Sequence, residues 1–168
     1  MALPVTLVVL SGLPGSGKSS VARELARALE FSLFELDHIE APILARFDGD
    51  ALGWGGYEIL SALAEDNLSL GRSVVLDSVA WTNPLREEWR MMAARHRARY
   101  RPIEVVVPDR ELHRTRVTAR TAKNDWPRLE AAFKLYEAWS GDRLVLDSSQ
   151  PLDALLAAAI AYVRSESV

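Results

Sequence analysis

The chain has 168 residues, 49% of them apolar and 26% charged, which suits one globular domain over residues 1–168. Its formal charge of −3 gives no general attraction to nucleic acid or anionic membranes, and the lack of cysteine excludes disulfides and thiol nucleophiles. The apolar stretch 3–10 is too short to span a bilayer and has no basic region before it. We therefore expect a cytoplasmic protein without a membrane or nucleic-acid partner, acting as a monomer or homodimer.

The first predicted element is a buried strand over 5–10, and the segment 12–19 that follows it has the sequence GLPGSGKS. This segment matches G-x-x-x-x-G-K-[ST] at every defined position and runs into a predicted helix over 19–29. Glycines let the backbone turn successive amides inward, and the start of the helix adds partial positive charge. The loop is thus predicted to bind the phosphates of a nucleoside triphosphate, although a glycine-rich turn with an incidental lysine is the alternative.

Within this loop, the ammonium of Lys18 would reach the β- and γ-phosphates, and the hydroxyl of Ser19 would bind Mg²⁺. The residues expected at the nucleotide are Gly12, Pro14, Gly15, Ser16, Gly17, Lys18, Ser19 and Ser20.

Two aspartates follow the next two predicted strands. The strand over 31–36 ends at Asp37, and the strand over 73–76 ends at Asp77; helices over 39–47 and 57–70 lie between them, on either side of a glycine-rich break. Ligands of parallel sheets bind beyond the carboxyl ends of the strands, so both carboxylates are expected beside the phosphate loop. Asp77 would hold Mg²⁺ or bind the acceptor. The alternative for each is a residue that ends a strand or caps a helix.

The second half continues the alternation of strands and helices. We predict a helix over 85–100 capped by Asn83, a strand over 103–107, helices over 111–121 and 128–139, a strand over 144–146 and a helix over 152–163. Strands joined by crossover helices, which are right-handed by rule, predict a three-layer α/β/α sandwich.

Four arginines lie in or just before the helix over 111–121: Arg110, Arg114, Arg116 and Arg120. Arg116 and Arg120 are four residues apart and share a helix face, where like charges repel unless an anion lies between them. The alternative is a solvated basic face paired with Asp109 and Glu111.

Taken together, the loop 12–19, the acidic residue closing the second strand, Val-Val-Leu-Asp at 74–77 and Arg116-x-x-x-Arg120 resemble the small P-loop kinases. This nucleoside-monophosphate-kinase-like or AAA_33 group includes gluconate kinase, zeta toxins, chloramphenicol phosphotransferase and the polynucleotide kinase domain. The resemblance implies the P-loop nucleoside triphosphate hydrolase fold with a five-stranded parallel sheet in the order 2-3-1-4-5. It also implies ATP and Mg²⁺ as cofactors and a lid at about 109–127, in which Arg116 and Arg120 clamp the γ-phosphate or stack on adenine.

By the same resemblance, Asp37 is the general base that accepts the proton of the acceptor hydroxyl, and the catalytic set is Lys18, Asp37, Arg116 and Arg120. The segment 38–72 would form the acceptor-binding region. It is mainly acidic and lacks the arginine fork that an anionic acceptor would need. His38, Ile39 and Glu40 follow the aspartate, as in the chloramphenicol-phosphotransferase pattern, where polynucleotide kinase has an arginine.

Trp54, Tyr57 and Trp81 would line an apolar acceptor pocket around a mobile loop at 53–56, unless they pack in the core. The predicted function is transfer of the γ-phosphate of ATP to a hydroxyl of a small neutral or cationic acceptor. A polynucleotide 5′-hydroxyl kinase and an ATP-binding switch or ATPase without a dedicated acceptor are the alternatives.

Overall fold

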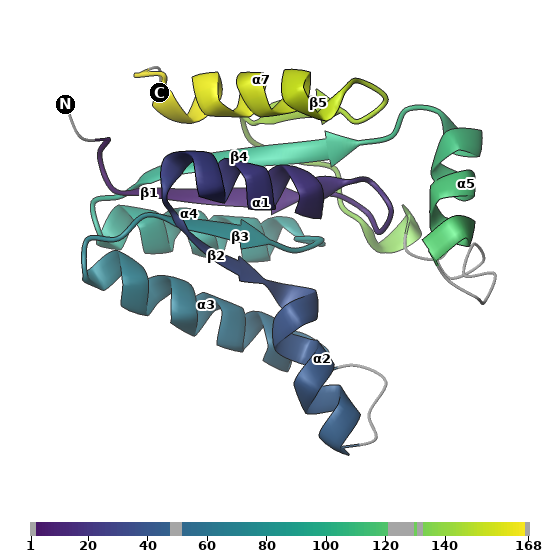
Figure 1. Cartoon of the computed structure of the whole chain (residues 1–168). Helices are drawn as coiled ribbons and strands as arrows, with labels where there is room; N and C mark the ends of the chain where they lie inside the picture. The colour runs from purple at the N-terminus through teal and green to yellow at the C-terminus, as the bar shows by residue number, and fades with distance from the viewer. Residues whose placement is uncertain (1–2, 48–51, 121–129, 131–132, 167–168) are drawn as a thin grey trace.

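The structure is a computed structural model that describes residues 3–47, 52–120, 130 and 133–166. Strands and helices alternate along the chain (Figure 1). The elements are β1 (Thr6–Ser11), α1 (Lys18–Leu29), β2 (Ser32–Glu35), α2 (Leu36–Phe47), α3 (Trp54–Ser69), β3 (Val74–Asp77), α4 (Asn83–Arg95), β4 (Arg99–Val106), α5 (Arg110–Arg120), β5 (Leu144–Asp147) and α7 (Leu152–Arg164).

Within the described residues, the strands form one five-stranded sheet in the order β2-β3-β1-β4-β5, with every neighbouring pair parallel. The predicted order is confirmed. Because all strands run the same way, their carboxyl ends share one edge of the sheet, and β1 leads from this edge into the glycine-rich loop (Figure 1). That edge carries every candidate site described below.

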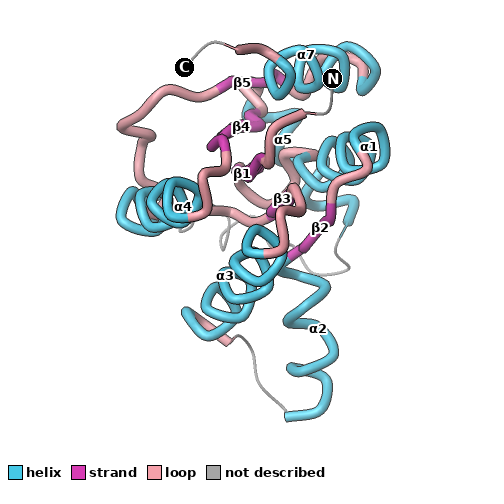
Figure 2. The backbone as a smooth tube through the Cα atoms, turned by 90° about the vertical axis from the view of Figure 1, so that its left-hand side faces the viewer, coloured by secondary structure: helices cyan, strands magenta, loops and turns pink. Residues whose placement is uncertain are grey.

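Helices cover both faces of the sheet, as the three-layer prediction requires (Figure 2). Alternation along β1 shows why: Leu7 and Val9 pack in one core with α3 and α4, whereas Val8 and Leu10 pack in a second core with α1 and α7. All four side chains are fully buried, and burying each stabilises the fold by roughly 1.5–3 kcal/mol. β1 is therefore the rigid centre from which the loop is presented.

The junction of α4 and β4 differs from the prediction. α4 ends at Arg95 and β4 begins at Arg99, so Tyr100 lies on the strand and not on the predicted helix. The helix stops because Arg97 adopts a left-handed φ of 54° and the Ala98 amide donates to the Ala93 carbonyl at 2.8 Å. The residue that precedes α4 is Thr82; Asn83, predicted as its cap, is the first helical residue.

The glycine-rich break also differs from the prediction. α3 begins at Trp54, so Gly55 and Gly56 lie inside a helix and do not form the expected loop. Gly56 serves packing here, because an added Cβ would overlap the carboxylate of Glu40 on α2. Of the predicted helix over 128–139, the structure describes helical residues at 130 and 133–135 and a non-helical segment from 136 onward.

Candidate functional site

The loop between β1 and α1 has the backbone of an anion-binding nest. Gly12, Gly15 and Gly17 have φ values of 145°, 80° and 89°, which L-residues rarely adopt. At Gly12 an added Cβ would also lie 2.7 Å from Ser16 Oγ and overlap the carbonyl oxygen of Val105. Glycine is therefore required at this position by both conformation and space.

Beneath the loop, an ammonium, a hydroxyl and a carboxylate converge. Lys18 opens α1 and is only 8% exposed, and its Nζ lies 3.9 Å from Oδ1 of Asp77, which is 4% exposed at the end of β3. Burial raises the pKa of Asp77, while the charge of Lys18 and a hydrogen bond from Ser19 oppose this. Asp77 Oδ1 has no hydrogen-bond partner in the described part of the chain. An orphaned carboxylate oxygen beside a hydroxyl suits Mg²⁺, which prefers oxygen ligands.

The carboxylate that closes β2 is Glu35, two residues before the aspartate expected there. Glu35 is 6% exposed and pairs with Asp77 in the sheet register. Arg23 donates to both of its oxygens, from Nε at 2.7 Å and from Nη2 at 3.0 Å, and His38 Nδ1 lies 2.7 Å from Oε2. The pair of the buried Glu35 with the half-exposed Arg23 fixes α1 against β2. The sequence reasoning missed Glu35, although an acid interrupting the apolar run 31–36 was a visible signal.

Asp37 lies in the first turn of α2 and is exposed, so the expectation that it ends the strand is wrong. It still lies on the edge of the sheet that carries the loop. Its negative charge contributes to the raised pKa of Asp77, and it also contributes to that of Glu40, where burial is the larger cause. Asp37 is thus a solvent-accessible carboxylate close enough to Asp77 to influence its pKa.

Arg116 joins α5 to the loop that precedes α7. Its Nη1 donates to Ser148 Oγ and its Nη2 to the Ser148 carbonyl oxygen, both at 2.7 Å. Beside it lies a cavity of about 470 Å³ that touches the glycine-rich loop on one side. The described residues that line it are Gly15, Gly17, Ser20, Val21, Arg116, Ala119, Ser148, Gln150, Leu152 and Leu155. Its size and mixed lining are those of a small-molecule site.

The model of the AAA_33 family, described as an AAA domain, matches residues 7–140. That match contains the glycine-rich loop, Asp77 and Arg116. The chain belongs to the AAA_33 family.

Relatives of this AAA_33 protein include kinases. Cytidylate kinase of Pyrobaculum calidifontis is 34% identical over 76 residues, which are 45% of this chain and 37% of that enzyme. The match thus spans little more than a third of that relative. A sugar kinase from Janibacter sp. HTCC2649 has a TM-score of 0.73 at 21% identity, over 95% of both chains. APS kinase of Mycobacterium tuberculosis, in complex with AMPPNP and APS, has 0.74 at 20%, over 97% of this chain and 99% of that one. These structural likenesses establish the P-loop kinase fold.

A histidine that the sequence did not single out connects α5 to the phosphate loop of the AAA_33 chain. His113 is 3% exposed, and its Nε2 lies 2.8 Å from the carbonyl oxygen of Pro14. Its ring meets Phe133 edge to face at 5.6 Å. α5 is therefore held against the loop.

The predicted lid is described only in part. α5 covers 110–120, and residues 121–127 lie outside the described residues. Arg120 is the last residue of α5, and its side chain also lies outside the described set, so the expected pairing with Arg116 stays a prediction. Arg110 donates to Glu130 at 2.6 Å, which fits the alternative of a basic residue paired at the surface.

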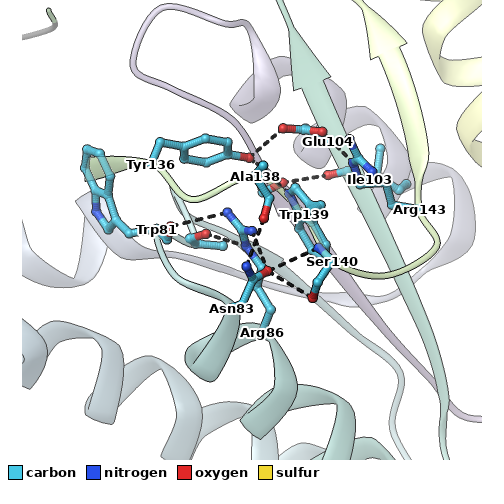
Figure 3. A network of polar contacts seen from close by, with 12 residues as sticks. Trp81, Asn83, Arg86, Ile103, Glu104, Tyr136, Ala138, Trp139, Ser140 and Arg143 are labelled. Atoms are coloured by element: carbon cyan, nitrogen blue, oxygen red, sulfur yellow. Dashed lines mark hydrogen bonds and ion pairs between the residues drawn. The ribbon is translucent and has the colours of Figure 1, made fainter. Parts of the chain in front are cut away.

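Residues 136–140 form a strap across the ends of α4 and β4 (Figure 3). Arg86 is 3% exposed and lies against two aromatic rings of the strap, with its Cζ 4.9 Å from the Tyr136 centroid and 4.3 Å from that of Trp139. It also donates to the Ala80 carbonyl at 2.8 Å and to Asn83 Oδ1 at 3.0 Å. Arg86 is thus a buried residue of α4 that holds the strap, although its charge would favour solvent.

The strap is also held from β4. Tyr136 donates its hydroxyl to Glu104 Oε1 at 2.8 Å and accepts a hydrogen bond from Trp139 Nε1 at 3.1 Å. Arg143 donates to the other oxygen of Glu104 at 2.5 Å, and Glu104 is 7% exposed (Figure 3). This network anchors the strap on the sheet.

A second cavity of about 470 Å³ lies between the N-terminal ends of α3 and α4, and we name it the α3/α4 cavity. Trp54 and Tyr57 line it as predicted, whereas Trp81 is not among its described lining residues. The lining consists of Trp54, Tyr57, Glu58, Ser61, Thr82, Pro84, Leu85, Glu88 and Glu137.

In the described part of the chain, no group of three or more acidic, histidine or cysteine side chains could hold a metal ion by itself. Mg²⁺ would therefore depend on the phosphates of a nucleotide as well as on Ser19 and Asp77. No helix among the described residues is long and apolar enough to cross a membrane.

Proposed function

We propose that this protein transfers the γ-phosphate of ATP to a hydroxyl group of a small neutral or cationic acceptor. The observation that carries the proposal is the buried Lys18–Asp77 pair, with Nζ and Oδ1 3.9 Å apart, beneath a loop of three left-handed glycines. Phosphoryl transfer needs positioning and charge more than covalent chemistry, and this arrangement supplies both. The complex of APS kinase with AMPPNP supports ATP as the donor.

The residues of the loop would bind the donor. Main-chain N–H groups of the loop, which Pro14 lacks, and the ammonium of Lys18 would contact the phosphates, and Ser20 would lie at the neighbouring cavity. Ser19 and Asp77 would hold Mg²⁺, which when bound neutralises charge on the phosphate oxygens. Arg116, and Arg120 beyond it, would supply positive charge to the transferred group from the lid at about 109–127.

Asp37 would act as the general base, within an acceptor region formed by 38–72. The acceptor oxygen attacks the γ-phosphorus, the bond to the bridging oxygen of ADP breaks, and the hydroxyl proton passes to the Asp37 carboxylate. The exposure of Asp37 supports this role, because an acceptor can reach its side chain from solvent.

A screen of hydroxyl compounds for ATP consumption and phosphorylated product tests the proposal, with Asp37→Asn beside wild type. We expect the substitution to lower transfer by about 10²–10⁴-fold while the affinity for Mg-ATP is retained. Unchanged transfer would refute the base assignment. Product found only on oligonucleotide 5′ ends would favour the polynucleotide kinase alternative, and ATP hydrolysis without any phosphorylated acceptor would favour the ATPase.

A further inference from the structure

The α3/α4 cavity presents aromatic rings to an incoming ligand. Trp54, the first residue of α3, is 58% exposed, and its ring lies 5.7 Å from that of Tyr57. Tyr57 in turn lies 6.2 Å from Trp89, which is fully buried and donates its indole N–H to Ser61 at 2.8 Å. The three rings thus form a row from the buried Trp89 to Trp54, whose ring is exposed to solvent.

The charge of the cavity is negative. Glu58 and Glu88 are exposed and make no ion pair within the described residues, and none of the described lining residues is lysine or arginine. The third carboxylate, Glu137, already accepts a hydrogen bond at 2.7 Å from the Asn83 amide at the start of α4. The N-termini of α3 and α4 together contribute about one positive charge, which is smaller than the three negative charges of the carboxylates. An anion would be repelled here.

Tyr57 lines the cavity and also lies within the electrostatic influence of the proposed base. It is 7% exposed, and its hydroxyl lies near Ala80 and Trp81 without forming a hydrogen bond of good geometry in the described part of the chain. Burial raises its pKa, and the charges of Glu40 and Asp37 add to the effect, so both carboxylates lie within electrostatic reach of its hydroxyl.

We propose that the α3/α4 cavity binds an organic cation that also carries a hydroxyl group, and that this amino alcohol or quaternary-ammonium alcohol is the acceptor. The inference rests on the proposed function and narrows its acceptor to the cationic class. An ammonium group would bind favourably through cation–π attraction to Trp54 and Tyr57. The negative charges of Glu58 and Glu88 would attract it as well. A neutral compound of the same shape would bind only through the burial of its apolar surface.

Choline and its uncharged analogue, in which a carbon atom replaces the nitrogen, test the proposal because they differ only in charge. Each is titrated against the full chain at constant ionic strength, with tryptophan fluorescence and ligand-observed NMR as readouts. We expect choline to bind about tenfold more tightly than the analogue, and Glu58→Gln/Glu88→Gln should reduce this ratio to about two- or threefold, because the aromatic contribution remains. Asp66→Asn/Glu87→Gln is the matched control on the same helices, outside the lining residues, and should keep the ratio.

Equal binding of the two probes, no saturable binding of either, or a ratio unchanged in the Glu58→Gln/Glu88→Gln variant would overturn the inference. Mg-ATP affinity measured on the same samples separates this failure from that of the proposed function, because the nucleotide loop lies apart from the substituted residues. Trp54→Leu gives a second check and should weaken choline more than its analogue.

Discussion

Replacing Gly12 with alanine should destabilise the fold and weaken nucleotide binding together. The φ of 145° is strained for an L-residue, at a cost of about 1–3 kcal/mol. The added Cβ would also meet Ser16 Oγ at 2.7 Å and overlap the carbonyl oxygen of Val105, a buried residue of β4, and such overpacking costs a further 1–3 kcal/mol or so. The expected loss is about 2–6 kcal/mol, a large part of the stability of a typical domain.

Urea unfolding followed by circular dichroism measures the stability, and calorimetric titration with Mg-ATP measures the affinity. Gly55→Ala is the matched control, because its added Cβ would meet nothing within 4 Å and the residue lies inside α3. We expect this control to gain about 0.5–1 kcal/mol, since alanine favours helix over glycine, and to keep its affinity. A Gly12→Ala protein as stable and as tight-binding as wild type would refute the described loop geometry.

Because burial raises the pKa of Asp77, this carboxylate should become protonated at a higher pH than an ordinary aspartate, and the Mg²⁺-dependent affinity for ATP should fall there. Calorimetric titrations at several pH values should show the fall, and the Asp77→Asn variant should lack this part of the pH dependence. Arg116→Met should weaken ATP binding about tenfold and change the unfolding free energy by less than ~1 kcal/mol, because Arg116 is partly exposed and its two hydrogen bonds, both to Ser148, lie near the surface. Arg86→Met should lower the free energy of unfolding in urea by about 2–4 kcal/mol, because the buried guanidinium donates to the Ala80 carbonyl and lies against two aromatic rings of the strap. A decrease as small as that for Arg90→Met, at an exposed position, would contradict this.

The strands could be predicted from patterns that lie within single segments, whereas their order in the sheet was implied by the resemblance to the small P-loop kinases. Apolar runs such as 5–10 and 73–76 are buried on both faces, and the loop 12–19 fixes which strand carries the nucleotide. The end of α4 could not be predicted, because Trp89, Met92 and Tyr100 keep helical spacing through the turn. A left-handed Arg97 ends the helix, and nothing in its identity signals that conformation.

The site divides in the same way. Lys18 and Ser19 were predictable because both belong to the loop motif itself. The acid at the end of β2 is Glu35 and not Asp37, because β2 ends two residues before its apolar pattern does. His113 and the strap act through partners far away in the sequence, such as Pro14, and no local pattern reports such contacts. Their roles follow only from the fold, which brings α5 and the strap to the edge of the sheet.

The most direct test is a calorimetric titration of wild type and Lys18→Met with ATP, each with Mg²⁺ and with a chelator. We predict saturable, Mg²⁺-dependent binding to wild type and an affinity roughly tenfold to a hundredfold lower for Lys18→Met, because a charged contact to the phosphates is worth about 1.5–3 kcal/mol. Binding that is absent from wild type, or equally tight in both proteins, would contradict the phosphate site at residues 12–19.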